Sequence, residues 1–218
     1  MNSFFSSICK IFLKPVVDKY LIKEVQGLEN VPVGNFILAA NHQSHLDWIA
    51  SAYPCVPRRF TYLGQVDKYT GFAGLERNLL YFIADVIPIN RKDEESKKTA
   101  LLETIKRLKG GDIVVIYPEG TRSRNGQLQK GKLGIAKIFL QTGVPILPMG
   151  IRGTFDILPP GRVFPRIKKN VEINIGRPLY FEKELKAAQN LNPESQEYKN
   201  LCQQIVDKVM EEIIKLIG

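Results

Sequence analysis

Apolar and polar residues follow one another along this chain in blocks that predict alternating strands and helices. Short apolar runs, typical of buried strands, lie at residues 36–40, 59–63, 81–89, 112–117 and 144–151. Residues 171–175 alternate between apolar and polar positions, as a half-buried strand does. Apolar residues at helical spacing predict helices over residues 46–53, 65–80, 94–109, 131–142 and 193–217. This order predicts an α/β layered fold with a central mixed, largely parallel sheet flanked by helices.

Two of these runs carry further information about their place in the sheet. Residues 112–117 are apolar and β-branched almost throughout, which predicts a central strand. Residues 144–151 contain Pro145 and Pro148, and because proline cannot donate a backbone hydrogen bond we expect this strand to be irregular or at an edge.

The first 24 residues predict an amphipathic helical segment that lies in a membrane interface. Its apolar and aromatic residues recur at helical spacing with lysines interspersed, which suits such a helix, although packing on the domain predicts the same pattern. Pro15 either breaks the segment or begins a second helix. The chain therefore divides into residues 1–24 and a single domain, residues 25–218.

Charge and cysteine content narrow the choice of partners. The formal net charge of +9 predicts anionic partners, either phosphorylated small molecules, acidic lipid surfaces, acidic proteins or nucleic acid. Three scattered cysteines, Cys9, Cys55 and Cys202, lack metal spacing and suggest a reducing compartment without a disulfide framework. No apolar run is long enough to span a bilayer, so membrane attachment would be peripheral or monotopic.

The turn between residues 36–40 and the next helix is the strongest candidate for chemistry. It contains both histidines of the chain, His42 and His45, followed by Asp47. An imidazole is the side chain best suited to proton transfer near neutral pH. A carboxylate five residues later could reach the far ring nitrogen of His42 and fix its tautomer, as in a catalytic triad.

Two structural alternatives explain the same residues. Ser44 and Asp47 fit a capping box, with Ser44 as the N-cap, which would make Asp47 structural. His42, His45 and Asp47 could instead bind a metal, but no further histidine or paired cysteine completes the usual ligand set. We therefore expect no metal.

A second polar cluster follows the strand predicted at residues 112–117. Because both loops leave the carboxyl ends of strands, they should open on the same side of the sheet. Arginine offers a planar set of donors that matches phosphate oxygens, and glycine lets a ligand approach the backbone closely. A solvated basic loop is the alternative. The candidate anion-binding residues are Arg91, Glu119, Gly120, Thr121 and Arg122.

Other reaction classes fit poorly. Gly126 and Gly131-Lys132 have the spacing of a phosphate-binding P-loop, but Leu133 replaces the required hydroxyl residue. No Gly-x-Ser-x-Gly elbow of a serine hydrolase occurs. Cys55 has no obvious activating base nearby in the sequence, so we expect a buried thiol rather than an acyl-carrying nucleophile.

Taken together, these motifs resemble the lysophosphatidic acid acyltransferase family of glycerolipid acyltransferases. The His-x4-Asp signature of that family matches His42 and Asp47, and its Glu-Gly-Thr-Arg block matches residues 119–122. Two further blocks resemble residues 87–91 and 144–148, and the order and spacing agree from about residue 25 to residue 180. The family often has a lysine where this chain has Gln65, and Lys68 could compensate; Lys132 is a further candidate.

The resemblance implies transfer of a fatty acyl group from acyl-CoA or acyl carrier protein to the sn-2 hydroxyl of 1-acyl-sn-glycerol-3-phosphate, giving phosphatidic acid. His42 would be the general base and Asp47 its orienting partner, with no cofactor beyond the donor substrate. The expected partners are an anionic membrane surface at its cytoplasmic face, a lysophospholipid and acyl carrier protein, and not nucleic acid. Two alternatives remain: another acceptor, such as glycerol-3-phosphate or a different lysolipid, or a non-catalytic lipid- or phosphate-binding module.

Overall fold

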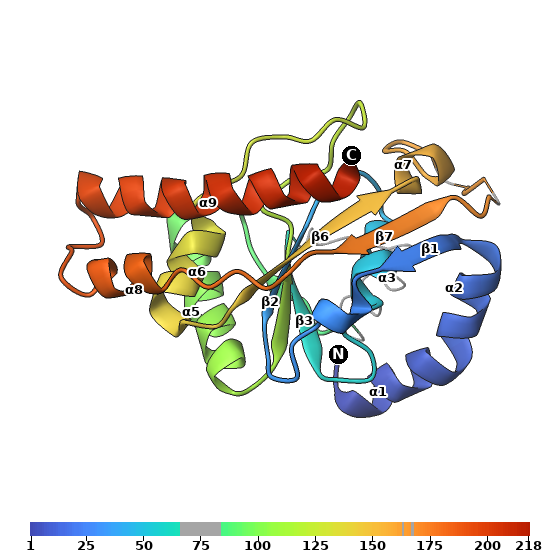
Figure 1. Ribbon diagram of the computed structural model, residues 1–218, viewed down its shortest axis with the longest axis horizontal. Helices are drawn as coiled ribbons and strands as arrows, with labels where there is room; N and C mark the ends of the chain where they lie inside the picture. Colours follow the sequence, from blue (N-terminus) through green and yellow to red (C-terminus); the bar gives the residue numbers. More distant parts are fainter. Residues whose placement is uncertain (66–83, 163, 167) are drawn as a thin grey trace.

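The computed structural model describes residues 1–65, 84–162, 164–166 and 168–218. Its strands form a seven-stranded sheet in the order β1-β7-β6-β2-β5-β3-β4 (Figure 1). Neighbouring strands run parallel except β6 and β7, which are antiparallel. The predicted mixed, largely parallel sheet flanked by helices is confirmed. The strands are β1 Ile22–Gln26, β2 Ile37–Ala40, β3 Phe60–Gly64, β4 Ile87–Pro88, β5 Ile113–Ile116, β6 Ile146–Arg152 and β7 Val171–Ile175.

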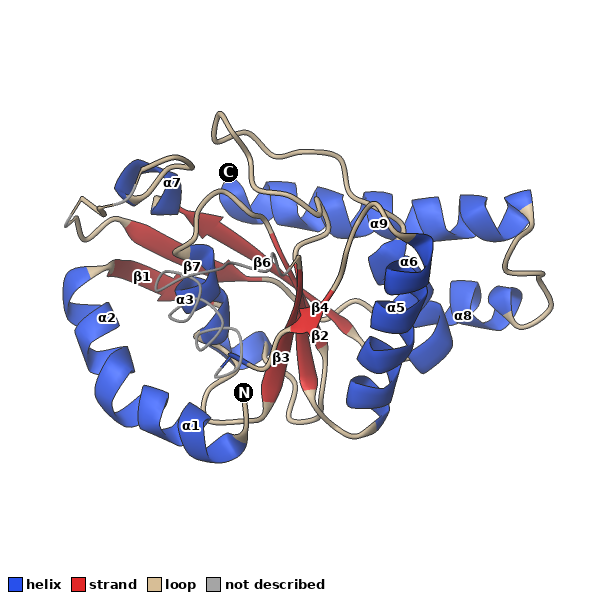
Figure 2. Cartoon of the chain, turned by 180° about the vertical axis from the view of Figure 1, so that it is seen from behind, coloured by secondary structure: helices blue, strands red, loops and turns tan. Residues whose placement is uncertain are grey.

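Helices cover both faces of the sheet (Figure 2). The N-terminal segment is helical from Ser3 to Tyr20, through α1 Ser3–Ile8, a π-helical turn Cys9–Leu13 and α2 Lys14–Tyr20. Pro15 lies in the first turn of α2, so it begins a second helix. The remaining helices are the 3-10 turn Leu28–Asn30, α3 Asp47–Ala52, α5 Glu94–Lys109, α6 Gly134–Thr142, α7 Thr154–Ile157, α8 Glu182–Ala188 and α9 Gln196–Ile217.

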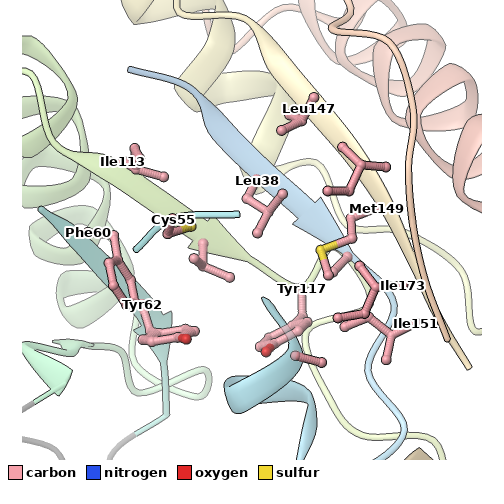
Figure 3. Close-up of a cluster of buried hydrophobic side chains, with 14 of the residues drawn as sticks. Leu38, Cys55, Phe60, Tyr62, Ile113, Tyr117, Leu147, Met149, Ile151 and Ile173 are labelled. Atoms are coloured by element: carbon pink, nitrogen blue, oxygen red, sulfur yellow. The ribbon is translucent and has the colours of Figure 1, made fainter. Parts of the chain in front are cut away.

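The pleat of the central strands separates two hydrophobic cores. In β2, Leu38 and Ala40 face the core that includes α3 and the N-terminal helices, whereas Ile37 and Ala39 face α6 and α9. Figure 3 shows the first core, where side chains from β2, β3, β5 and β6 meet. All four residues of β2 and β5 are buried, as expected for strands covered on both faces.

The prediction that residues 144–151 form an irregular or edge strand is wrong. Strand β6 lies between β7 and β2, and six of its seven residues are buried. Pro148 is tolerated because it lies just beyond the end of β7, since Met149 pairs with Ile175. Its carbonyl still accepts a hydrogen bond from the Gly176 N–H at 2.9 Å.

Three other expectations differ from the structure or lie outside it. Strand β1 crosses the boundary drawn after residue 24 and pairs with β7, and neither β1 nor α8 was expected from the sequence. Of the strand predicted at residues 81–89, residues 81–83 lie outside the described residues, and within residues 84–89 only Ile87–Pro88 is a strand. The helix expected at residues 65–80 lies almost wholly outside the described residues. The division into residues 1–24 and 25–218 stays a prediction.

The parallel strands bring five loops to one edge of the sheet. Because β2, β3, β4, β5 and β6 run in the same direction, the segments that follow them leave at the same carboxyl edge. The histidine turn follows β2, and the Glu-Gly-Thr-Arg loop follows its neighbour β5. Residues about 80 positions apart in the chain can therefore meet at this edge.

Candidate active site

His42 and Asp47 form a hydrogen-bonded pair at the carboxyl edge of the sheet. The His42 Nδ1 and Asp47 Oδ2 atoms are 2.8 Å apart, and both side chains are buried. A ring nitrogen that faces a carboxylate carries the proton, so Nδ1 donates and Nε2 keeps its lone pair. This is the arrangement that a histidine needs in order to accept a proton from a substrate hydroxyl.

The Asp47 carboxylate is fixed by three further donors. Oδ2 also accepts the backbone N–H groups of Gln43 at 2.6 Å and Ser44 at 2.7 Å. Oδ1 accepts the Thr154 hydroxyl at 2.6 Å. With four donors around a fully buried carboxylate, the side chain has a single orientation, and its charge is compensated by hydrogen bonds.

The capping-box alternative is correct for the Asp47 carboxylate and wrong for the N-cap position of Ser44. The Ser44 N–H donates to Asp47, as a capping box requires. However, residues 45 and 46 form a turn, so α3 begins at Asp47 with Leu46 as its N-cap, and the Ser44 hydroxyl donates to the Leu158 carbonyl. The same carboxylate thus shapes the turn and contacts the imidazole.

The His42 ring is held between its turn and the strand next to it. Tyr117, directly after β5, stacks on the imidazole with ring centroids 4.0 Å apart and planes at 11°. The Tyr117 hydroxyl bonds Ser51 of α3 at 2.9 Å, and burial raises the tyrosine pKa well above its usual value. The Asn41 amide bonds both backbone groups of Ile151 in β6, at 2.8 and 2.7 Å, which fixes the start of the turn.

The Glu119 carboxylate joins the histidine turn to the second loop by accepting backbone N–H groups from both. Its Oε1 accepts the His42 N–H at 2.7 Å and its Oε2 accepts the Gln129 N–H at 2.8 Å. The residue is only 2% exposed, and burial raises the pKa of its carboxyl to about 7. Both oxygens are therefore occupied by main-chain donors, and the expected role of Glu119 at the substrate phosphate stays a prediction.

We expect Glu119→Gln to lower the unfolding free energy by about 1–3 kcal/mol, because one of the two backbone N–H groups would then face an amide NH₂. The folded wild type binds the Glu119 proton more tightly than the unfolded chain, whose glutamate titrates near 4.5. The contribution of Glu119 to stability therefore falls as the pH rises from about 4.5 to 7.

The variant lacks this titration, so its stability deficit relative to the wild type should be larger at pH 5 than at pH 8. Urea unfolding of both proteins at the two pH values measures the difference. A deficit that grows toward pH 8 would contradict the raised pKa.

Apart from Lys68, the remaining candidates line one cavity with His42. Its volume is about 1650 Å³, larger than the roughly 300–1,000 Å³ of a typical small-molecule pocket, so it has room for more than one substrate. Gly120 has a φ of +70°, and a Cβ built on it would lie 3.0 Å from Lys132 Nζ, so glycine lets the lysine lie against the loop backbone. The sequence-predicted residues in the lining are His42, Arg91, Gly120, Thr121, Arg122 and Lys132.

Some expected or tested residues lie elsewhere. Lys68 lies outside the described residues. Cys55 is fully buried, and burial raises the pKa of its thiol to about 12, which fits the expected buried thiol. In the described part of the chain, no group of three or more histidine, cysteine or acidic residues could hold a metal ion.

Sequence reasoning missed three residues around the His42–Asp47 pair, which are Ser51, Tyr117 and Thr154. Thr154 is 107 positions from Asp47 and directly follows the Gly153 turn after β6, so no local pattern links the two. Tyr117 ends the strongest predicted strand and precedes the Glu-Gly-Thr-Arg block, which was a usable signal. Its place against His42 follows from the pairing of β2 with β5.

Comparison with known proteins identifies the family of this chain. The family model described as Acyltransferase matches residues 23–152. A chloroplastic 1-acyl-sn-glycerol-3-phosphate acyltransferase from Brassica napus is 30% identical over 188 residues, which are 84% of this chain and 52% of that protein. The corresponding enzyme from Borreliella burgdorferi is 30% identical over 157 residues, 72% of this chain and 58% of that protein. The chain thus spans little more than half the length of these curated relatives.

A solved structure is also similar. The crystal structure of the 1-acyl-sn-glycerophosphate acyltransferase PlsC from Thermotoga maritima has a TM-score of 0.59 and 25% sequence identity, covering 97% of this chain and 78% of that one. The sequence motifs, the family model and the fold thus agree. The resemblance to lysophosphatidic acid acyltransferases is confirmed, and the chain belongs to the acyltransferase family.

Proposed function

We propose that the protein transfers a fatty acyl group from a thioester, acyl-CoA or acyl carrier protein, to the sn-2 hydroxyl of 1-acyl-sn-glycerol-3-phosphate. The observation that carries the proposal is that His42, bonded to the buried Asp47, lines a cavity that Arg91 and Arg122 also line. The names of the relatives from Brassica napus and Borreliella burgdorferi give the same acceptor.

In this mechanism His42 Nε2 removes the proton of the acceptor hydroxyl while Asp47 holds the ring and stabilises the imidazolium. The acceptor oxygen attacks the thioester carbonyl carbon, and a tetrahedral intermediate forms. When the C–S bond breaks, the imidazolium returns the proton to the leaving thiolate. The ester and a free thiol are the products, and no acyl-enzyme is formed.

The acceptor is positioned by its phosphate. Arg91 and Arg122 supply guanidinium donors to the phosphate oxygens, with Thr121 and the Gly120 backbone beside them. Lys132 lies against Gly120 and adds a third positive charge. An anchored phosphate places the hydroxyl near His42, and such positioning lowers the barrier by removing the entropy cost of the encounter.

Release of free thiol from acyl-CoA, followed with a panel of acceptors, tests this function. Thiol should appear only when an acceptor is present, and fastest with 1-acyl-sn-glycerol-3-phosphate. Faster release with glycerol-3-phosphate or another lysolipid would identify that compound as the acceptor and contradict the proposed one. Acceptor binding without any thiol release would favour a non-catalytic lipid-binding module.

The N-terminal helices provide the contact with an anionic membrane surface. Phe4 and Phe12 are 69% and 70% exposed, and Lys10 and Lys19 of the same segment are also exposed. Apolar side chains flanked by lysines are typical of helices that lie in a lipid interface. In the described part of the chain, no helix is both long and apolar enough to cross a membrane. We propose peripheral attachment at the cytoplasmic face.

We expect Phe4→Ser/Phe12→Ser to weaken co-sedimentation with vesicles of acidic lipid by at least about tenfold, because two large apolar side chains no longer enter the lipid. High salt should weaken binding of the wild type as well. Substitution is a better test than deletion of the N-terminal segment, because Val17 of that segment is packed in the core. The control Leu102→Ser/Tyr180→Ser removes two exposed apolar side chains elsewhere and should bind normally. Equal binding by all three proteins would contradict the interfacial role.

A further inference from the structure

The cavity continues past His42 toward helices α5 and α6, which cover the opposite face of the sheet from α3. Helices α5 and α6 pack side by side (Figure 2), and residues from the first half of each line the cavity. We call this part the α5–α6 groove; it is formed by Lys97, Lys98, Leu101, Lys132, Leu133 and Lys137.

The α5–α6 groove is lined by both apolar and basic side chains. Leu101 and Leu133 are half-buried and supply apolar surface between the lysines. Lys98, Lys132 and Lys137 make no ion pair with the described parts of the chain, whereas Lys97 pairs with Glu94 at 2.5 Å. The acidic residues in the cavity lining are Glu94 and Glu95 on α5 and Glu194 before α9, three against the four lysines of the groove. Positive charge is therefore in excess along the groove.

The backbone adds to this positive potential. Helices α5 and α6 follow β4 and β5, whose carboxyl ends lie at the same edge of the sheet. Both helix N-termini therefore lie at the edge where the cavity opens. A helix N-terminus carries a partial positive charge and favours anions. Lys97 and Lys98 lie in the first turns of α5, and Lys137 in the first turn of α6.

The proposed acceptor does not use these charges. Its single phosphomonoester is matched by Arg91, Arg122 and Lys132, which leaves Lys98 and Lys137 of the groove without a substrate group. The second substrate of the proposed reaction is a thioester donor. CoA carries a diphosphate and a 3′-phosphate, joined to an adenine and a pantetheine arm that offer apolar surface.

We propose that the α5–α6 groove binds the phosphorylated nucleotide of a CoA thioester, with Lys98 and Lys137 as phosphate-binding residues. Leu101 and Leu133 of the lining contact the less polar parts of the donor. Because β5 is adjacent to β2, the pantetheine arm leads from α6 to the His42 edge within the same cavity. The donor role rests on the proposed acyl transfer.

The test is a binding measurement with CoA and with pantetheine, which lacks every phosphate. The wild type should bind CoA at least about tenfold more tightly than pantetheine, since charge-assisted contacts to phosphate are strong. Lys98→Gln/Lys137→Gln should weaken CoA binding by about tenfold or more and leave pantetheine binding unchanged. The control Lys106→Gln/Lys109→Gln removes two exposed charges from the other end of α5 and should bind CoA like the wild type.

Each outcome decides the proposal. Equal binding of CoA and pantetheine by the wild type overturns it, and so does a CoA affinity that the Lys98/Lys137 variant retains. If holo-acyl carrier protein binds tightly and free CoA does not, the groove binds a carrier protein, and the proposal is also overturned. CoA binding that depends on both lysines, without thiol release to any acceptor, supports the groove while the proposed acyl transfer fails.

Discussion

Replacing His42 by alanine should lower kcat by a factor of at least about 10²–10⁴, the usual contribution of a positioned general base. The variant loses the ring nitrogen that pairs with the Asp47 carboxylate. The fold should survive, because the turn keeps the Asn41 and Ser123 hydrogen bonds to the neighbouring segments. Thiol release at saturating acyl-CoA and lysolipid measures the loss, and circular dichroism checks the fold.

His45 offers the matched control, since it is the other histidine of the chain and lines the same cavity. Its side chain is exposed, whereas that of His42 is buried and bonded to Asp47. We expect His45→Ala to keep the rate within about tenfold of the wild type. An equal loss in both variants, or a His42→Ala enzyme at full rate, would remove His42 from the chemistry.

Asp47→Asn should lower kcat by roughly 10²–10⁴ while the unfolding free energy falls by only about 1–2 kcal/mol. The amide oxygen can take the place of Oδ2 and accept from His42, Gln43 and Ser44, and the NH₂ can donate to the Thr154 hydroxyl. The hydrogen bonds survive in neutral form, but no negative charge remains to stabilise the imidazolium. A purely capping role predicts the opposite result, a retained rate with reduced stability.

Thr154→Val separates stability from charge at the same carboxylate. It removes the donor to Oδ1 and should lower the unfolding free energy by a similar amount, about 1–3 kcal/mol. The negative charge beside His42 remains, so the rate should fall far less than in Asp47→Asn. If both variants lost the same activity, the rate would follow stability and the orienting role of Asp47 would be wrong.

Elements with a strong local signal were predicted well. The helix expected at residues 94–109 is α5 Glu94–Lys109, where Asp93 caps the first turn and Gly110 follows the last residue. The strand expected at residues 171–175 is β7 Val171–Ile175, with its alternating burial. In both cases the periodicity and the end signals lie within the element itself, so no distant contact was needed to define it.

Elements that depend on their neighbours were predicted less well. Strand β1 was missed because Ile22–Gln26 is short and mostly exposed, and it is a strand only through pairing with β7, about 150 residues later. Strand β6 was assigned to an edge from its prolines, yet the end of β7 next to Pro148 makes proline acceptable in the interior. Local propensity cannot report where a partner strand stops.

The sequence by itself predicted the contact between His42 and Asp47, because these residues lie five positions apart across one turn and their contact is local. It also determined the family, through the order and spacing of four motifs. Only the tertiary structure decided that Thr154 holds Asp47, that Tyr117 stacks on His42, and that Glu119 bonds the His42 backbone. The physical reason is that these contacts join segments 75 to 107 positions apart, and such distances close only when parallel strands align their carboxyl ends.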